Sequence, residues 1–155
     1  MTRIHKILCP VNFSGVSRRA VDYAIQLAES LEAELSLLHI VGPILPSSYE
    51  LSMNIGEILK ALSNEATSRL KEWAKNAESA GVPIRRTVRI GEIEDLIVRA
   101  IHSEKVDLIV VGGQGGGVFE QRVVRSAICP VLIVPARGTP RQKPSAKKHL
   151  SKLAA

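Results

Sequence analysis

Five glycines fill the six positions from Gly112 to Gly117, between the apolar run Val106–Val111 and a helical pattern that starts at Val118. Glycine is unfavourable inside helices and strands, so this segment is predicted to be a loop. Such a loop can bring backbone N–H groups close to a phosphate, together with the free N–H groups that open the next helix. It can equally be a tight crossover in which glycine supplies a positive φ where no side chain fits. The spacing alone leaves both interpretations open.

The other side chains that could do chemistry are scattered. Cys9 and Cys129 are far apart in the sequence and have neither a CxxC partner nor a His cluster, which predicts buried, reduced thiols and no metal site. His39 lies in an apolar run without a placed Ser, Cys or carboxylate partner. This setting favours a hydrogen-bonded core histidine over a catalytic one.

Strand-like and helix-like patterns alternate along the chain. Apolar runs predict strands at Ile4–Pro10, Glu34–Val41, Ile84–Ile90, Val106–Val111 and Pro130–Pro135, the first of them stopped by its proline. Helical spacing predicts helices from Ser17 to Leu31 with Ser14 or Ser17 as cap, from Ile58 to Ala77, from Glu92 to His102 and from Val118 to Ile128. The alternation predicts an α/β domain with a parallel sheet covered by helices on both faces.

In such sheets ligands bind beyond the carboxyl ends of the strands, where the strand order reverses. Three predicted loops lie at carboxyl ends: Pro10–Ser14, Gly42–Gly56 and Gly112–Gly117. The Gly42–Gly56 loop contains two prolines and several serines, and long loops in compact domains often serve binding. We therefore expect a ligand, if one is bound, at this edge of the sheet.

Length and charge set further bounds. With 155 residues, 45% of them hydrophobic, the chain has the size of one domain with a substantial core. No apolar stretch reaches the roughly 20 residues of a membrane span and no signal-peptide core follows the N-terminus, so we expect a cytoplasmic protein with no membrane partner. The net charge of +6 comes entirely from residues 136–155, where no acid accompanies Arg137, Arg141, Lys143, Lys147, Lys148 and Lys152. This basic tail is predicted to be disordered, as a solubilising segment or as a salt-sensitive tether for polyanions.

Four segments have an order and spacing found together in one family: KILCPVNFS near the N-terminus, LLHIV at the end of the second strand, VDLIVVG before the glycine loop, and CPVLIVP at the last strand. On these motifs residues 1–135 resemble the universal stress protein family. The resemblance implies a five-stranded parallel sheet of strand order 3-2-1-4-5 and a homodimer. It also implies a stress-response regulatory role, with ATP bound by many members and not by others.

The resemblance also implies which residues would hold a nucleotide. In the members that bind ATP, the adenosine lies against the segment after the first strand, here Pro10, Val11 and Asn12, and against the end of the second strand, here Ile40. Asn12 stands where those members usually carry aspartate, so this position keeps a hydrogen-bonding side chain and loses the charge. The phosphates lie on a signature of Gly, two residues, Gly, about nine residues, and then Gly followed by Ser or Thr.

Gly112 and Gly115 match the first half of that signature, and the second half has two placements. Counting on from Gly115 reaches Ser126, which leaves too few residues for the helix that must return across the sheet. Anchoring on the CPV motif keeps that helix and places a deletion of about eight residues upstream, so that the Gly–Ser pair is absent. We prefer the second placement, in which the N–H groups that follow Gly117, beginning at Val118, form an anion site of their own.

The two edge strands of the implied sheet differ in charge. Ile84–Ile90 carries three arginines, whereas Val131–Val134 carries no charge, and uncharged edges favour pairing. We therefore predict a homodimer through Val131–Val134, with an edge covered by the chain's own tail as the alternative.

The leading hypothesis is a cytoplasmic stress-response regulator of the universal stress type that is not an enzyme and has a degenerate or absent ATP site. One alternative is a molecular switch that binds ATP or AMP with at most slow hydrolysis. The other is an adaptor that tethers polyanions through its basic tail.

Overall fold

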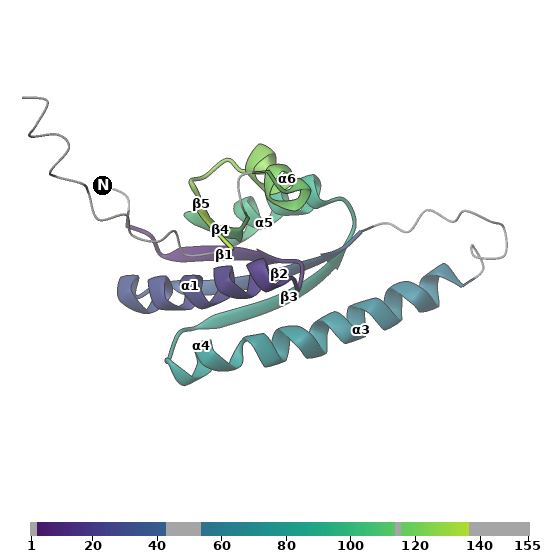
Figure 1. Cartoon of the computed structure of the whole chain (residues 1–155), viewed down its shortest axis with the longest axis horizontal. Helices are drawn as coiled ribbons and strands as arrows, with labels where there is room; N and C mark the ends of the chain where they lie inside the picture. The colour runs from purple at the N-terminus through teal and green to yellow at the C-terminus, as the bar shows by residue number, and fades with distance from the viewer. Residues whose placement is uncertain (1–2, 43–53, 114–115, 137–155) are drawn as a thin grey trace, which may run out of the picture.

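The computed structural model describes residues 3–42, 54–113 and 116–136. Five strands form one parallel sheet of order β3-β2-β1-β4-β5, which confirms the predicted fold class (Figure 1). The strands are β1 (Lys6–Val11), β2 (Glu34–Val41), β3 (Ile84–Ile90), β4 (Leu108–Gly112) and β5 (Val131–Val134). Gly115 and, apart from Ala136, the predicted basic tail lie outside the described residues.

Helices cover both faces of the sheet (Figure 1). On one face lie α1 (Gly15–Leu31), α3 (Ile55–Trp73) and α4 (Lys75–Ser79), and on the other lie α5 (Ile93–Glu104) and α6 (Val118–Ser126). The helix predicted from Ile58 to Ala77 is thus two helices that meet at Ala74, and it begins inside the predicted Gly42–Gly56 loop, of which residues 43–53 lie outside the description. No helix in the described ranges is long and apolar enough to span a membrane.

The central strand β1 is buried on both sides because its residues alternate between two cores. Ile7 and Cys9 pack with α1, α3 and α4, whereas Leu8 packs with α5 and α6. All three side chains are fully buried. Each large aliphatic side chain buried in this way stabilises the fold by about 1.5–3 kcal/mol, which explains why the strand sequence is almost continuously apolar.

The prediction that Pro10 stops the first strand was wrong. Pro10 lies inside β1, opposite Leu38 of β2, and the strand ends after Val11. On its other side β1 pairs with β4 only through Ile7 and Leu8. Pro10, which has no backbone N–H to donate, lies beyond the end of that ladder.

The last helix also differs from its prediction. It ends at Ser126, two residues before the predicted Ile128, because the chain turns toward Pro130, and residues ahead of a proline avoid helical backbone angles. Val124 and Ile128 are exposed, while Val123 is fully buried.

Gly112 allows β4 and α1 to approach each other closely. A Cβ at Gly112 would overlap the backbone carbonyl of Val16, in the first turn of α1. The described glycines of the loop do not have a positive φ, which in the described residues occurs only at Gly81 and Gly91 among the glycines. The expectation that glycine supplies a positive φ here was therefore wrong for those residues: at Gly112 it supplies space.

Replacing Gly112 with alanine should therefore lower the free energy of unfolding by about 1–3 kcal/mol, as overpacking does, because the added methyl group meets backbone that cannot rotate away. Urea unfolding followed by circular dichroism measures this change. The matched control is Gly116→Ala, where nothing lies within 4 Å of the new Cβ, and a change within about 0.5 kcal/mol is expected. Equal stability of the two variants would contradict the proposed contact.

An ion pair joins α5 to α6. Arg122 donates from Nε to Glu94 Oε1 and from Nη2 to Glu94 Oε2, each at 2.6 Å, and it also reaches Glu92 Oε2 at 3.2 Å. The Arg122 hydrogen bonds, with help from the backbone N–H of Glu94 itself, lower the pKa of Glu94 from an ordinary 4.5 to about 2. Because these side chains are partly exposed, solvent weakens the pair, and its modest stabilisation at neutral pH should be visible as a pH dependence of stability.

The ion pair between Arg122 and Glu94 should make the melting temperature of the wild type fall more steeply as the pH is lowered. Because the folded-state pKa of Glu94 lies below its unfolded value, the stabilisation is full above about pH 4.5 and is lost as the pH falls toward 2. In Arg122→Gln the decline of the melting temperature between these pH values should be shallower. Thermal melts at pH steps measure this, with Arg19→Gln on the exposed side of α1 as the charge-matched control. An unchanged slope in Arg122→Gln would contradict the assignment.

Candidate functional site

Two hollows open at the carboxyl ends of β1, β2 and β4, and Asn12 borders both of them. The first, which we call the α3 hollow, measures about 350 Å³ and is lined by Asn12, Phe13, His39, Ile40, Val41, Gly42, Leu62, Glu65, Ala66 and Arg69. The second, the glycine hollow, measures about 560 Å³ and is lined by Asn12, Ser14, Val16, Gly112, Gly113, Gly116, Gly117, Val118, Phe119 and Glu120. Both volumes fall within the range of about 300–1,000 Å³ that small-molecule sites occupy.

The Asn12 side chain is held by the start of α1. Its Oδ1 accepts hydrogen bonds from Ser14 N at 3.2 Å, from Ser14 Oγ at 2.6 Å and from Ser17 Oγ. Ser17 Oγ in turn accepts from Asn12 N at 3.1 Å, and Ser14 Oγ caps α1 by accepting from Ser17 N at 3.1 Å. With Oδ1 engaged three times, the side chain offers a ligand its Nδ2 group, which only donates.

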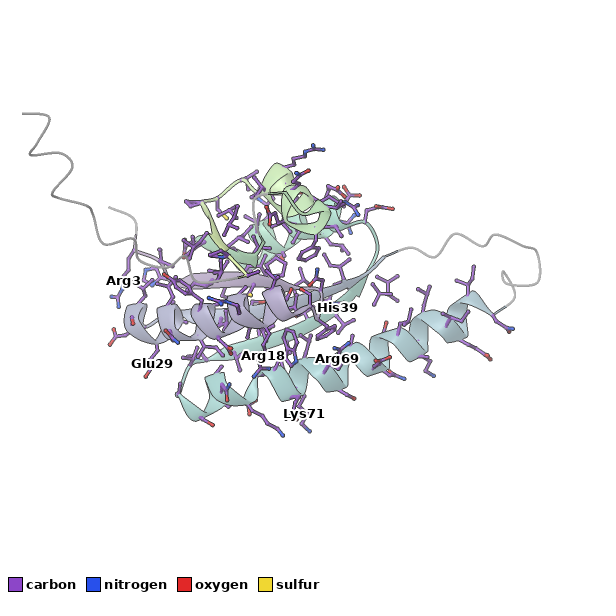
Figure 2. The ribbon with its side chains drawn as sticks, viewed as in Figure 1. Arg3, Arg18, Glu29, His39, Arg69 and Lys71 are labelled. Carbon is purple, nitrogen blue, oxygen red and sulfur yellow. The ribbon has the colours of Figure 1, made fainter. Side chains whose placement is uncertain are left out.

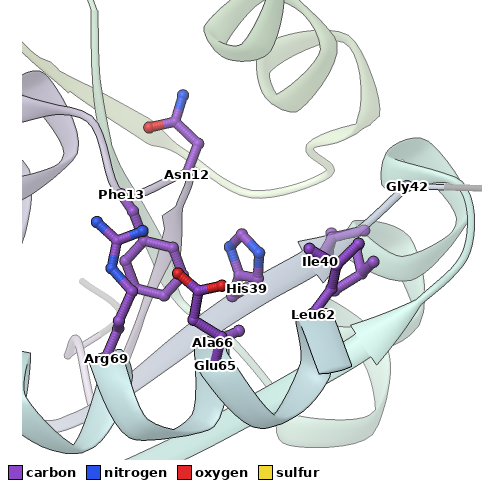
Figure 3. Close-up of a pocket in the computed structure, with 10 residues that line it drawn as sticks. Asn12, Phe13, His39, Ile40, Gly42, Leu62, Glu65, Ala66 and Arg69 are labelled. Carbon is purple, nitrogen blue, oxygen red and sulfur yellow. The ribbon is translucent and has the colours of Figure 1, made fainter. Parts of the chain in front are cut away.

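Phe13 and His39 form one wall of the α3 hollow (Figure 3), and Trp73 packs against Phe13. Phe13 has a left-handed backbone with φ 59°, an uncommon conformation for a bulky residue and one that is found at functional sites. Its ring lies 4.5 Å from the His39 ring and 5.2 Å from the Trp73 ring. The Arg69 guanidinium lies 4.3 Å from the Phe13 ring centroid, and the Arg18 guanidinium lies 5.2 Å from that of Trp73. Each ring therefore has a cation over it, Arg69 from α3 and Arg18 from α1, and both arginines are labelled in Figure 2.

His39 lines this hollow and is not a fully buried core residue. It is half-buried, and its Nδ1 lies 2.7 Å from the Val11 carbonyl oxygen. Burial lowers the pKa of His39, and the nearby Arg69 charge lowers it further, against the opposing effect of the Val11 hydrogen bond. The neutral ring donates from Nδ1 to Val11 and keeps Nε2 as an acceptor. The predicted hydrogen bond is present, whereas the predicted core position is corrected.

One face of α3 completes the hollow, and sequence reasoning did not assign it to the site. Leu62, Glu65, Ala66 and Arg69 all line the hollow and project from α3 toward β2 (Figure 3). Their spacing of three, four and seven residues is the repeat of one helical face. That spacing was a usable signal, but a mixed set of apolar and charged residues is also typical of an ordinary solvent-facing helix.

The glycine hollow lies between the starts of α1 and α6. The N-cap of α6 is Gly117, which has no side chain to cap the helix, and α6 begins directly after it at Val118. The N–H of Gly113 is not free for a ligand, because it donates to the Val134 carbonyl at 3.0 Å. Glu120, the third residue of α6, is buried and lies against Gly113.

Ser126 lies at the opposite end of α6 from the glycine hollow. It is the last residue of α6, is buried, and donates from Oγ to the Arg122 carbonyl at 2.6 Å. The structure therefore agrees with the second placement of the phosphate signature, in which a complete return helix follows Gly117 and no serine stands at the beginning of that helix.

The predicted site residues fall into three groups. Asn12 and Ile40 line the α3 hollow, and Asn12, Gly112, Gly117 and Val118 line the glycine hollow. Pro10 and Val11 are buried in β1 and line neither hollow, although the Val11 carbonyl orients His39. Gly115 lies outside the described residues.

The chain matches known proteins of one kind. The model of the universal stress protein family matches residues 3–135. A universal stress protein of Methanocaldococcus jannaschii is 34% identical over 143 residues, which cover 83% of this chain and 81% of the relative.

Solved structures share the fold. The universal stress protein UspA from Lactobacillus plantarum has a TM-score of 0.76 at 22% identity, over 86% of this chain and 99% of that one. A universal stress protein family member from Arabidopsis thaliana with AMP bound has a TM-score of 0.64 at 22% identity, over 89% of this chain and 97% of that one. With the family model spanning most of its length and a relative above 30% identity, the chain belongs to the universal stress protein family.

Proposed function

We propose that this chain is a cytoplasmic, non-catalytic stress-response regulator that binds the adenosine part of an adenine nucleotide and lacks a site for a triphosphate. The observation that carries the proposal is the position of Ser126 at the end of α6, together with a glycine loop that leads straight into that helix. The serine that would clasp a triphosphate in the family's ATP-binding members is absent from the mouth of the loop.

The α3 hollow supports the adenosine half of the proposal. It combines an aromatic ring at Phe13 and apolar side chains at Ile40 and Leu62 with the acceptor Nε2 of His39. A purine needs apolar surface for its faces and a few polar partners for its edge. Asn12 Nδ2 is placed between the two hollows to donate to a ribose hydroxyl, and the Arabidopsis relative carries AMP.

The histidine and cysteine side chains that could be reactive support the non-catalytic part of the proposal. The ring nitrogen Nδ1 of His39 is engaged by the Val11 carbonyl, and burial raises the pKa of the Cys9 thiol to about 12, which leaves it unreactive at neutral pH. Cys129 is half-buried, in contrast to its predicted burial, and burial likewise raises its pKa. Both thiols are free, as is usual in the reducing cytoplasm.

Calorimetric titration with ATP, AMP and cyclic AMP tests the proposal. All three should bind, and ATP should bind no more than about threefold more tightly than AMP, because no group awaits its second and third phosphates. ATP binding that is tighter by two orders of magnitude would establish a triphosphate site and contradict the proposal. Failure of all three compounds to bind would contradict the adenosine half.

The placement of the base in the α3 hollow has its own variant. Leu62→Asp should weaken AMP binding at least about tenfold, because it removes apolar surface and adds a charge at the wall of the hollow. Ala61→Asp on the neighbouring exposed position of α3 is the matched control and should leave binding unchanged. Equal effects of the two variants would place the base elsewhere.

We further propose a homodimer through β5. Among the described residues, seven large apolar side chains are exposed, and four of them lie in the segment from α6 to β5: Val118, Val124, Ile128 and Ile133. Strand β5 is an uncharged sheet edge, and Ile133 on it is 40% exposed, whereas the opposite edge strand β3 carries Arg85, Arg86 and Arg89. Uncharged edges pair with a second copy more readily than charged ones.

Charging the β5 edge should break such a dimer. Ile133→Arg is expected to raise the dimer dissociation constant at least about tenfold, because a guanidinium would be buried opposite its own symmetry mate. Sedimentation equilibrium measures the constant. Ile90→Arg on β3, where the isoleucine is 49% exposed, is the matched control for the other edge and should remain dimeric. A monomeric wild type, or a dimer that only Ile90→Arg disrupts, would contradict the assignment.

A further inference from the structure

Glu120 is a buried acid inside the glycine hollow. The residue is only 3% exposed, and its carboxylate lies so close to Gly113 that a Cβ there would overlap Oε2. In the described part of the chain, no hydrogen-bond donor reaches this Oε2 atom. A buried carboxylate oxygen without a partner is unfavourable, and its persistence calls for a group that it serves.

The position of this carboxylate is the one that a phosphate would take. Glu120 is the third residue of α6, where the free N–H groups and the helix dipole stabilise negative charge. Gly113 N–H is already committed to Val134, so the hollow has little else with which to hold an anion. A phosphate entering the hollow would therefore meet a like charge at short range.

The remaining polar groups define what the hollow can accept. Glu120 is the one acid among the described residues that line the hollow, and Asn12 contributes the donor Nδ2. A neutral hydroxyl group can accept a hydrogen bond from Asn12 Nδ2 and meets no like charge at Glu120. An ammonium group is attracted by the carboxylate, whereas a phosphate can accept from Asn12 Nδ2 but is repelled by the carboxylate.

We propose that Glu120 makes the glycine hollow select a hydroxyl group over a phosphate, so that the ligand of this protein is a nucleoside with a free 5′-hydroxyl. The inference rests on the proposed function, because it takes the base in the α3 hollow and the 5′ end in the glycine hollow. It adds the ligand class: an unphosphorylated adenine nucleoside, discriminated from its own nucleotide by one buried side chain.

A ligand series on the wild-type protein tests the selection without any mutation. Adenosine, its 5′-amino-5′-deoxy analogue and AMP share the base and sugar and place a neutral, a positive and a negative group at the 5′ position. Calorimetry should show that adenosine binds at least about tenfold more tightly than AMP, and that the ammonium analogue binds at least as tightly as adenosine. The interaction of a unit charge with the carboxylate, at an effective dielectric constant of about 20, is large enough to account for such a difference in affinity. AMP binding equal to or tighter than adenosine would overturn the proposal.

The variant Glu120→Gln keeps the shape of the side chain and removes its charge. The ratio of adenosine to AMP affinity should fall at least about fivefold, mainly through tighter AMP binding. Glu78→Gln on exposed α4 makes the same charge change away from the site and should keep the wild-type ratio. A ratio that responds equally in both variants, or in neither, would also overturn the proposal.

The outcomes separate the two proposals. If adenosine and AMP bind equally and Glu120→Gln changes nothing, the selection fails while the adenosine site stands. If no compound of the series binds the wild type, both fail. Should Glu120→Gln not fold by circular dichroism, the order of the ligand series on the wild type decides the question.

Discussion

The Asn12 side chain joins the end of the central strand to the beginning of α1, and both hollows depend on this connection. Its Oδ1 receives donors from Ser14 and Ser17, which are also the residues that cap and open α1. The helix start is thereby held over the sheet at the point where the strand order reverses, between β1 and β4. Phe13 follows in a left-handed conformation that sends its ring toward His39 and Arg69. One hydrogen-bonded residue thus positions the rim of one hollow and the aromatic wall of the other.

The charges at this edge of the sheet depart together from the pattern of an ATP site. Where the ATP-binding members of the family usually carry aspartate, Asn12 is neutral and offers a donor. Where their phosphates would lie, Glu120 supplies a negative charge of the protein's own. A neutral, hydroxyl-bearing ligand is compatible with both changes, because it can accept from Asn12 Nδ2 and meets no like charge at Glu120. A polyanion can also accept from Asn12, but it is repelled by Glu120.

Sequence reasoning was sufficient where periodicity decides the outcome. Alternation of apolar runs with helical spacing predicted the parallel sheet, and the family motifs implied its strand order. It failed where one residue's effect depends on a neighbour distant in the chain. Pro10 continues β1 because the ladder with β4 has already ended, and Gly112 is required by the Val16 carbonyl, not by its own φ. Sequence reasoning did not assign Glu120 to the site, since nothing in the sequence indicates that Gly113 leaves room for its carboxylate.

The length of the crossover from β4 to β5 connects these features. A return helix must cover the sheet, so α6 keeps Val123 fully buried against the α5 side and cannot be shortened much below its nine residues. With few residues between β4 and α6, the helix has to open immediately after Gly117. Its third residue then falls beside Gly113, at the one end of the helix that stabilises a negative charge. A longer loop would have left that position to a bound anion; the short one brings a carboxylate of the chain itself to the same place.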